Sequence, residues 1–138
     1  EKARSWLGSL YNNTGWSYHD MGDYESALKV FQKAEAVRKS KGRVNEIRIA
    51  QWCVARTLRS LKRVEEALSK QMALKAEFEA AGERDGYVFE ELGECLLALE
   101  RAQEAQLYFA KAYEILSQDT WLAEKEPDRI ARLKELAA

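Results

Sequence analysis

Apolar residues recur at spacings of three and four along nearly the whole chain, which is the spacing that places them on one face of an α-helix. Polar or glycine-containing breaks interrupt this pattern at residues 21–23, 41–43, 61–63, 81–83, 100–101 and 118–120. Pro127 is the only proline, so the segments between the breaks are free to be helical. The pattern predicts about six helices of roughly 15–20 residues and a further C-terminal helix, joined by short connections typical of antiparallel neighbours.

A set of small and aromatic residues recurs in the same frame. Gly15, Ala27, Phe31 and Ala34 have the same mutual spacing as Gly93, Ala105, Phe109 and Ala112. Between them, Ala55, Ala67, Gln71 and Leu74 follow the frame with weaker residues. A period near 40 residues predicts three helical hairpins, and because one hairpin cannot cover its own apolar face, each is expected to stack on the next.

This frame resembles the tetratricopeptide (TPR) repeat. Residues 11–18, with Gly15 and Tyr18, followed by the Gly-Asp-Tyr turn at 22–24, are similar to the family pattern. Residues 89–96 begin a second good match, and residues 51–58 begin a degenerate third. The proline that often ends a TPR repeat is absent, and the period is longer than usual. Both departures are similar to long-helix TPR proteins such as kinesin light chains, adaptors of the Pins type and peptide-sensing bacterial regulators.

The resemblance implies an all-α fold, a right-handed α-solenoid with three TPR-like repeats over residues 1–118, at about 3–42, 43–81 and 82–118. Residues 119–138 are predicted to form a C-terminal capping helix. Pro127 suits a first helical turn, and Ile130 and Leu133 lie on one apolar stripe of that helix. We expect Trp121 to anchor this cap.

The resemblance also implies a concave groove lined by the first helix of each hairpin, on the side opposite its packing stripe. The groove candidates are Asn13, Trp16, Asp20, Trp52, Arg56, Arg59, Tyr87, Glu90 and Glu94. Asn13 stands two residues before Gly15, where long-helix TPR families often place an asparagine that hydrogen-bonds a peptide backbone, and an amide both donates and accepts. The alternatives are a solvated Asn13 and tryptophans that pack inside the solenoid.

Arg56 and Arg59 lie one turn apart and could clamp a carboxylate. The alternative is an intramolecular pairing with Glu90 and Glu94. The carboxylate clamp of chaperone-binding TPR domains is not expected, because Glu90, Glu91 and Glu94 stand where that resemblance would want cations.

Composition narrows the function further. The 138 residues carry 22 Lys+Arg and 23 Asp+Glu, a net charge of −1, which argues against a general nucleic-acid binder. One histidine, two cysteines and no catalytic motif predict no metal, no cofactor and no enzymatic activity. The charge is unevenly spread: residues 1–80 hold 15 Lys+Arg and 10 Asp+Glu, whereas residues 81–138 hold 7 and 13.

The sequence therefore predicts a protein–protein interaction module that holds a peptide or helix of a partner protein. The alternative is the sensor domain of a longer protein that binds a signalling peptide or small ligand, because the chain starts without Met and residues upstream are expected. Cys53 and Cys95 form no CxxC pair and are interpreted as two thiols in a reducing cytosol, with a disulfide between them as the alternative. With the lack of a membrane-spanning segment, this interpretation predicts a cytoplasmic location. Trp6, Leu7 and Leu10 at the N-terminal edge predict a weak homodimer.

Overall fold

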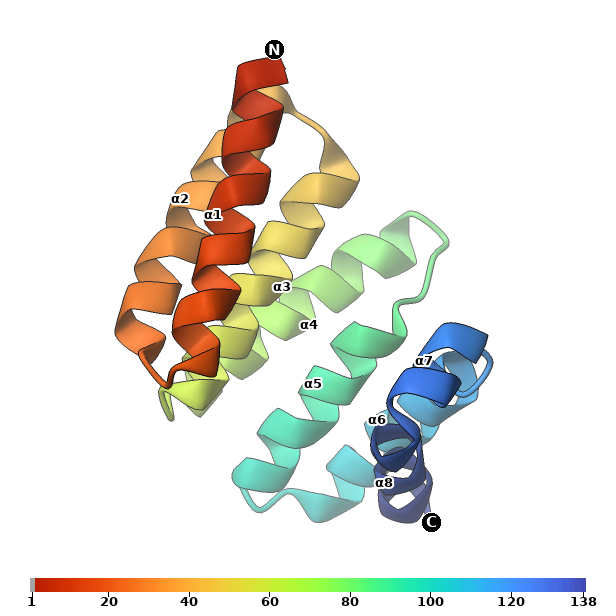
Figure 1. The fold of residues 1–138 in the computed structure, drawn as a ribbon. Coiled ribbons are helices and arrows are strands. Elements are labelled where there is room, and N and C mark those ends of the chain that lie inside the picture. Colours follow the sequence, from red (N-terminus) through yellow and green to blue (C-terminus); the bar gives the residue numbers. More distant parts are fainter. Residues whose placement is uncertain (1) are drawn as a thin grey trace. The chain divides into compact units, whose positions relative to one another are not determined.

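The computed structural model describes the backbone of residues 2–138 and the side chains from Tyr11 to Ala138. Over residues 2–138 every regular element is a helix (Figure 1). The helices are α1 (Lys2–Asp20), α2 (Tyr24–Lys41), α3 (Val44–Ser60), α4 (Val64–Ala80), α5 (Gly86–Ala98), α6 (Ala102–Leu116), α7 (Thr120–Lys125) and α8 (Pro127–Ala137). They form two compact units, unit 1 (residues 1–70) and unit 2 (residues 71–138), with the division inside α4.

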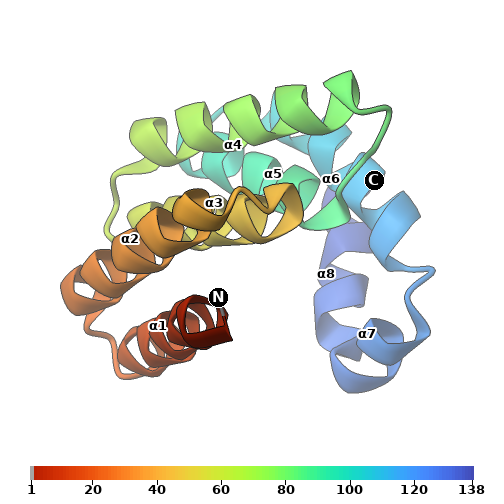
Figure 2. The same cartoon turned by 90° about the horizontal axis from the view of Figure 1, so that it is seen from above.

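In unit 1, α1 and α2 form a hairpin (Figure 2). A Cβ atom on Gly15 would lie 2.5 Å from the ring of Phe31, so only glycine allows this approach of α1 to α2. Phe31 and Ala27 are fully buried at the contact. Asp23 accepts a hydrogen bond from the backbone N–H of Ser26 at 3.2 Å and so caps the start of α2. The sequence frame therefore predicts the first hairpin correctly.

The connection from α2 to α3 is short. Gly42 ends α2 in the left-handed conformation, with φ +70°, and its N–H bonds back to carbonyls of the last turn. α3 packs against α2. An ion pair between Arg38 and Glu46, 3.1 Å apart, joins the two helices where both side chains are at least half-buried.

Unit 2 repeats the same packing with different residues. A Cβ atom on Gly93 of α5 would lie 2.8 Å from the ring of Phe109 of α6, and Phe109 is 1% exposed. Asp85 caps α5 by accepting from the backbone N–H of Val88 at 3.0 Å. α5 has 13 residues, fewer than predicted, because the connection before it extends to Asp85. The two helix pairs α1–α2 and α5–α6 thus share one close glycine–phenylalanine contact.

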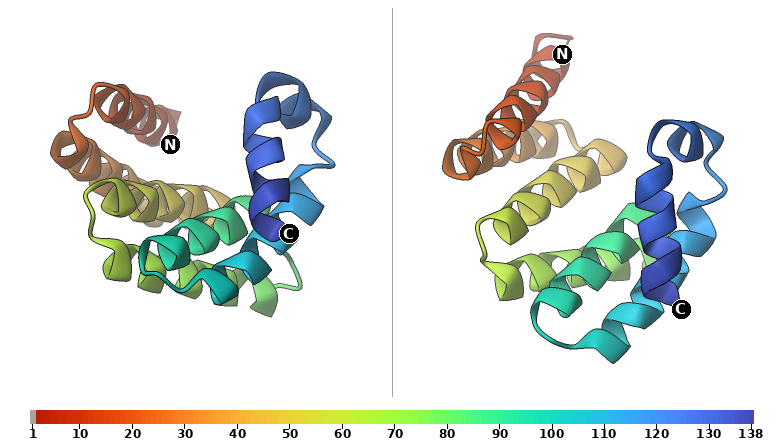
Figure 3. Two further views of the ribbon diagram at one scale, coloured as in Figure 1. Left: turned by 90° about the horizontal axis from the view of Figure 1, so that it is seen from below. Right: turned by 60° about the horizontal axis from the view of Figure 1, so that its bottom comes forward.

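Residues 119–138 form two short helices, of which the sequence predicted only the second. Asp119 caps α7 through the N–H of Leu122, and Pro127 is the first residue of α8. α8 packs against α6 and α7 (Figure 3). Leu122 and Leu133 are each 1% exposed, whereas Trp121 is 61% exposed. The prediction that Trp121 anchors this segment is therefore wrong, because its neighbour Leu122 is the residue turned inward.

Candidate functional site

Two tryptophans meet on one side of unit 1. Trp16 of α1 and Trp52 of α3 have ring centroids 6.2 Å apart, and both side chains are half-buried. Trp16 also packs edge-on against Phe31, 4.9 Å away, so part of its ring belongs to the hairpin core. The packing interpretation of Trp16 is therefore correct for part of the ring, and its role in a groove stays a prediction. The remaining surface of the two rings forms a shared aromatic platform.

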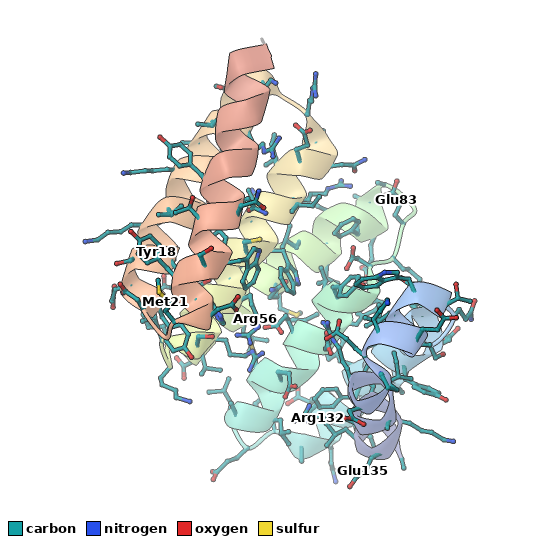
Figure 4. The ribbon with its side chains drawn as sticks, in the orientation of Figure 1. Tyr18, Met21, Arg56, Glu83, Arg132 and Glu135 are labelled. Atoms are coloured by element: carbon teal, nitrogen blue, oxygen red, sulfur yellow. The ribbon has the colours of Figure 1, made fainter. Side chains whose placement is uncertain are left out.

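A polar cluster lies one turn further along the same helices. Arg56 of α3 donates from Nη1 to the hydroxyl of Ser60 at 2.7 Å (Figure 4). The same hydroxyl lies 2.8 Å from Nε2 of His19 on α1. Because the hydroxyl oxygen accepts from Arg56, its own proton is available to Nε2 of a neutral imidazole. Ser60 therefore links α1 to α3 and orients both the imidazole and the guanidinium.

The electrostatics of this cluster keep His19 neutral. Burial lowers the pKa of His19 below its ordinary value of 6.5, and the charge of Arg56 lowers it further. Arg59 acts in the same direction, whereas exposed Asp20 opposes the shift. Since the two arginines outweigh the one nearby carboxylate in their effect on the imidazole, this end of the site is positive.

Asn12 contributes to the other end of the site. A hollow of about 30 Å³, enough for one water molecule, is lined by Asn12, Arg38, Glu46, Ile49 and Ala50. Burial raises the pKa of the nearby Cys53 thiol to about 12, and hydrogen bonding with Trp16 and Asn12 partly opposes this shift. Asn13, the asparagine predicted from the sequence to contact a peptide, is exposed, and its backbone carbonyl accepts from the Ser17 hydroxyl at 3.2 Å.

The spacing of the sequence contained a signal for Asn12. Asn12, Trp16 and His19 follow one another at i, i+4 and i+7, so they lie on one stripe of α1. We call the surface that this stripe forms with α3 the α1–α3 face. Its described residues are Asn12, Trp16, His19, Trp52, Arg56 and Ser60.

The corresponding candidates in unit 2 are held by the C-terminal helix. Tyr87, Glu90 and Glu94 form a stripe on α5, which we call the α5 acidic stripe. Arg129 of α8 donates from Nε to Glu90 at 2.9 Å, makes a second bond from Nη2 to the other oxygen, and stacks over the ring of Tyr87 at 5.3 Å. Arg132 of α8, labelled in Figure 4, donates to Glu94 through a single guanidinium nitrogen, Nη1.

These contacts bury the stripe. Glu90 is only 7% exposed, and hydrogen bonding to it raises the pKa of Arg129. The pKa of Tyr87 is raised mainly by burial. The sequence analysis left open a pairing of Glu90 and Glu94 with Arg56 and Arg59. Arginines of α8 now provide partners for both carboxylates, and their role was missed because 39 and 38 residues separate each pair.

Some predictions fall outside this description. Trp6, Leu7 and Leu10, the proposed homodimer edge, lie outside the residues whose side chains are described. Within the searched part of the chain, no three His, Cys, Asp or Glu side chains gather as metal ligands do. No described helix is long and apolar enough to cross a membrane.

The chain was compared with known proteins. A family model described as a tetratricopeptide repeat matches residues 8–40. The NMR structure of the first TPR domain of the human RPAP3 protein is similar in fold, with a TM-score of 0.65, covering 94% of this chain and 93% of that chain at 16% sequence identity. No curated protein sequence gives a significant match. Residues 8–40, which contain the Gly15–Phe31 contact, therefore form a tetratricopeptide repeat, and the fold of the chain is similar to that of a TPR domain.

Proposed function

We propose that this protein binds an extended peptide segment of a partner protein on the α1–α3 face. Tetratricopeptide-repeat domains are in general protein–protein interaction modules, so a protein partner is the expected kind of ligand. The same similarity to TPR domains favours a scaffold over a catalyst, and the aromatic rings and hydrogen-bonding groups of the face suit the binding of a peptide. No observation on the described residues favours the alternative of a small-ligand sensor.

The observation that carries this proposal is the juxtaposition of an aromatic platform with oriented polar groups. Trp16 and Trp52 offer ring surface to apolar side chains, and such half-exposed aromatics are typical centres of binding energy. The cluster at Ser60 fixes Arg56 beside the platform, so its guanidinium loses less conformational freedom on binding. We place Asn13, Asp20 and Arg59 at the margin of the same face as further peptide contacts.

We assign a different role to the α5 acidic stripe. Glu90 and Glu94 are already neutralised by Arg129 and Arg132, so a peptide could contact Tyr87, Glu90 and Glu94 only after α8 gives up these bonds. The proposed binding surface therefore centres on unit 1. The stripe contributes to ligand binding only in a form of the protein in which α8 has been displaced.

Binding of synthetic peptides to matched variants tests the proposal. A random nine-residue peptide library is screened against the native chain, and dissociation constants of the selected peptides are then measured for Trp52→Ala, Arg56→Ala and Lys33→Ala. We expect at least a tenfold loss for the first two variants and no change for Lys33→Ala, an exposed change on α2. Circular dichroism melting checks that the variants fold. Equal affinity of all three variants would refute the assignment.

A further inference from the structure

The α1–α3 face has two chemically different ends. At one end lies the hollow beside Asn12, where Ile49 and Ala50 of α3 form the apolar part of the wall and the paired side chains of Arg38 and Glu46 form the rest. At the other end lie His19 and Arg56, both bonded to Ser60. The two ends differ in what they offer a ligand: the hollow has room for a group of about 30 Å³, whereas the arginine end presents guanidinium donors.

The distance between the ends follows from helix geometry. His19 follows Asn12 by seven positions on α1, and Arg56 follows Ile49 by seven positions on α3. At 1.5 Å per residue, each step is about 10 Å along the helix axis. The contact of Trp16 with Trp52, midway between the ends, keeps the two helices in this register. An extended peptide covers about 10 Å in about three residues.

We propose that the peptide carries an acidic side chain at the arginine end and a small side chain in the hollow, three residues apart. This inference rests on the proposed function, because it specifies the ligand of the same face. Glycine, alanine and serine are the residues small enough for the hollow of about 30 Å³. The two residues between the anchors lie over Trp16 and Trp52, where apolar side chains are favoured.

Charge complementarity selects the acidic anchor. A guanidinium matches the planar carboxylate of Asp or Glu, with two parallel donors. Arg56 and Arg59 both lower the pKa of His19, so their positive field extends across this end of the face. Asp20 is the carboxylate that raises the pKa of His19, but its side chain is exposed and its effect is smaller than that of the two arginines together.

A spacing experiment tests the inference. Nine-residue synthetic peptides with glutamate fixed at the centre and all other positions randomised are arrayed and probed with the full chain. Gly, Ala and Ser are expected to be enriched at least fivefold three residues from the glutamate, on the side set by peptide direction, relative to one or two residues away. A control array with glutamine at the centre is expected to lose at least tenfold in signal.

Two variants connect the preference to its structural cause. Ile49 is 57% exposed, so Ile49→Trp adds bulk over the hollow without disturbing the core, and it should abolish the small-residue preference while retaining glutamate dependence. Arg56→Gln should abolish the dependence on glutamate and retain the preference for small residues. Leu107→Trp, a change at a 66% exposed residue of α6, is the matched control and should alter neither preference.

The outcomes distinguish a failure of the spacing inference from a failure of the proposed binding face. A preference for small residues that is equal at all distances from glutamate, or that survives Ile49→Trp, overturns the spacing inference and leaves the binding face in place. Peptides that bind with no dependence on Trp52 or Arg56 overturn both. Failure of every peptide on either array to bind also overturns both.

Discussion

The α1–α3 face and the α5 acidic stripe are built on the same hairpin but are completed differently. Gly15 and Phe31 in unit 1 and Gly93 and Phe109 in unit 2 make the same close contact. Residues 1–70 hold 14 Lys+Arg against 8 Asp+Glu, whereas residues 71–138 hold 8 against 15. In unit 2, two of the carboxylates, those of Glu90 and Glu94, form ion pairs with arginines of α8 that cover the α5 acidic stripe. One scaffold therefore supports an aromatic, basic face in one unit and an internally paired face in the other.

The largest expected effect on stability comes from disrupting the glycine–phenylalanine contact that both units contain. Gly15→Ala and Gly93→Ala each place a methyl group 2.5–2.9 Å from a buried phenylalanine ring, where neither atom has room to move. Each change should lower the free energy of unfolding by about 2–3 kcal/mol. Urea unfolding measures the loss, with Ala110→Ser, a change at an exposed position of α6, as the control. A loss of less than about 0.5 kcal/mol would contradict the shared-contact argument.

The second effect is specific to unit 2. Arg129→Ala leaves the buried carboxylate of Glu90 without its two hydrogen bonds and should destabilise the fold by about 2 kcal/mol. Arg101→Ala removes a pair with Glu104 that is fully exposed to solvent, and it should leave the free energy of unfolding almost unchanged. Hydrogen exchange is expected to locate the loss in α8. Equal costs for the two variants would show that the pairing does not hold α8 in place.

The third effect concerns the degenerate middle frame. Gln71 stands where the other frames have Phe31 and Phe109, and its amide is fully buried with no hydrogen-bond partner among the described residues. Gln71→Leu should therefore raise the free energy of unfolding by about 1 kcal/mol. Gln71→Glu places a carboxylate at the same buried position and should strongly lower the free energy of unfolding. A destabilising Gln71→Leu would mean that the amide has a partner in solution, such as bound water.

The smallest effect belongs to unit 1 and depends on pH. Because folding lowers the pKa of His19 below 6.5, the unfolded chain binds the proton more tightly. The resulting stability is present above pH 6.5 and is lost as pH falls through the folded pKa, by less than about 1 kcal/mol for a partly exposed group. His19→Gln should flatten this part of the pH profile. Since His19 is the only histidine, its NMR titration measures the pKa directly, and a value above 6.5 would contradict the prediction.

The sequence predicted the fold better than it predicted the face. Spacing identified the glycine–phenylalanine contacts because they lie on neighbouring helices with a fixed short separation in the chain. The placing of Trp16 and Arg56 in one groove came from the resemblance to TPR repeats and stays a prediction. Spacing missed the bond of Arg129 to Glu90, because helical periodicity says nothing about which distant helix a side chain meets. It also could not place Asn12 at a hollow, since that depends on Ile49 and Ala50 of another helix.

The two cysteines, neither of which forms a disulfide, have a practical consequence. Cys53 is buried in unit 1 and Cys95 is buried in unit 2, so each unit contains one shielded sulfur. The raised pKa of Cys53 keeps it protonated at neutral pH, and an alkylating reagent reacts with the thiolate. Labelling at either position then requires that unit to open. Mass spectrometry of the two cysteine-containing peptides during slow alkylation would thus time the opening of each half of the molecule separately, without any engineered probe.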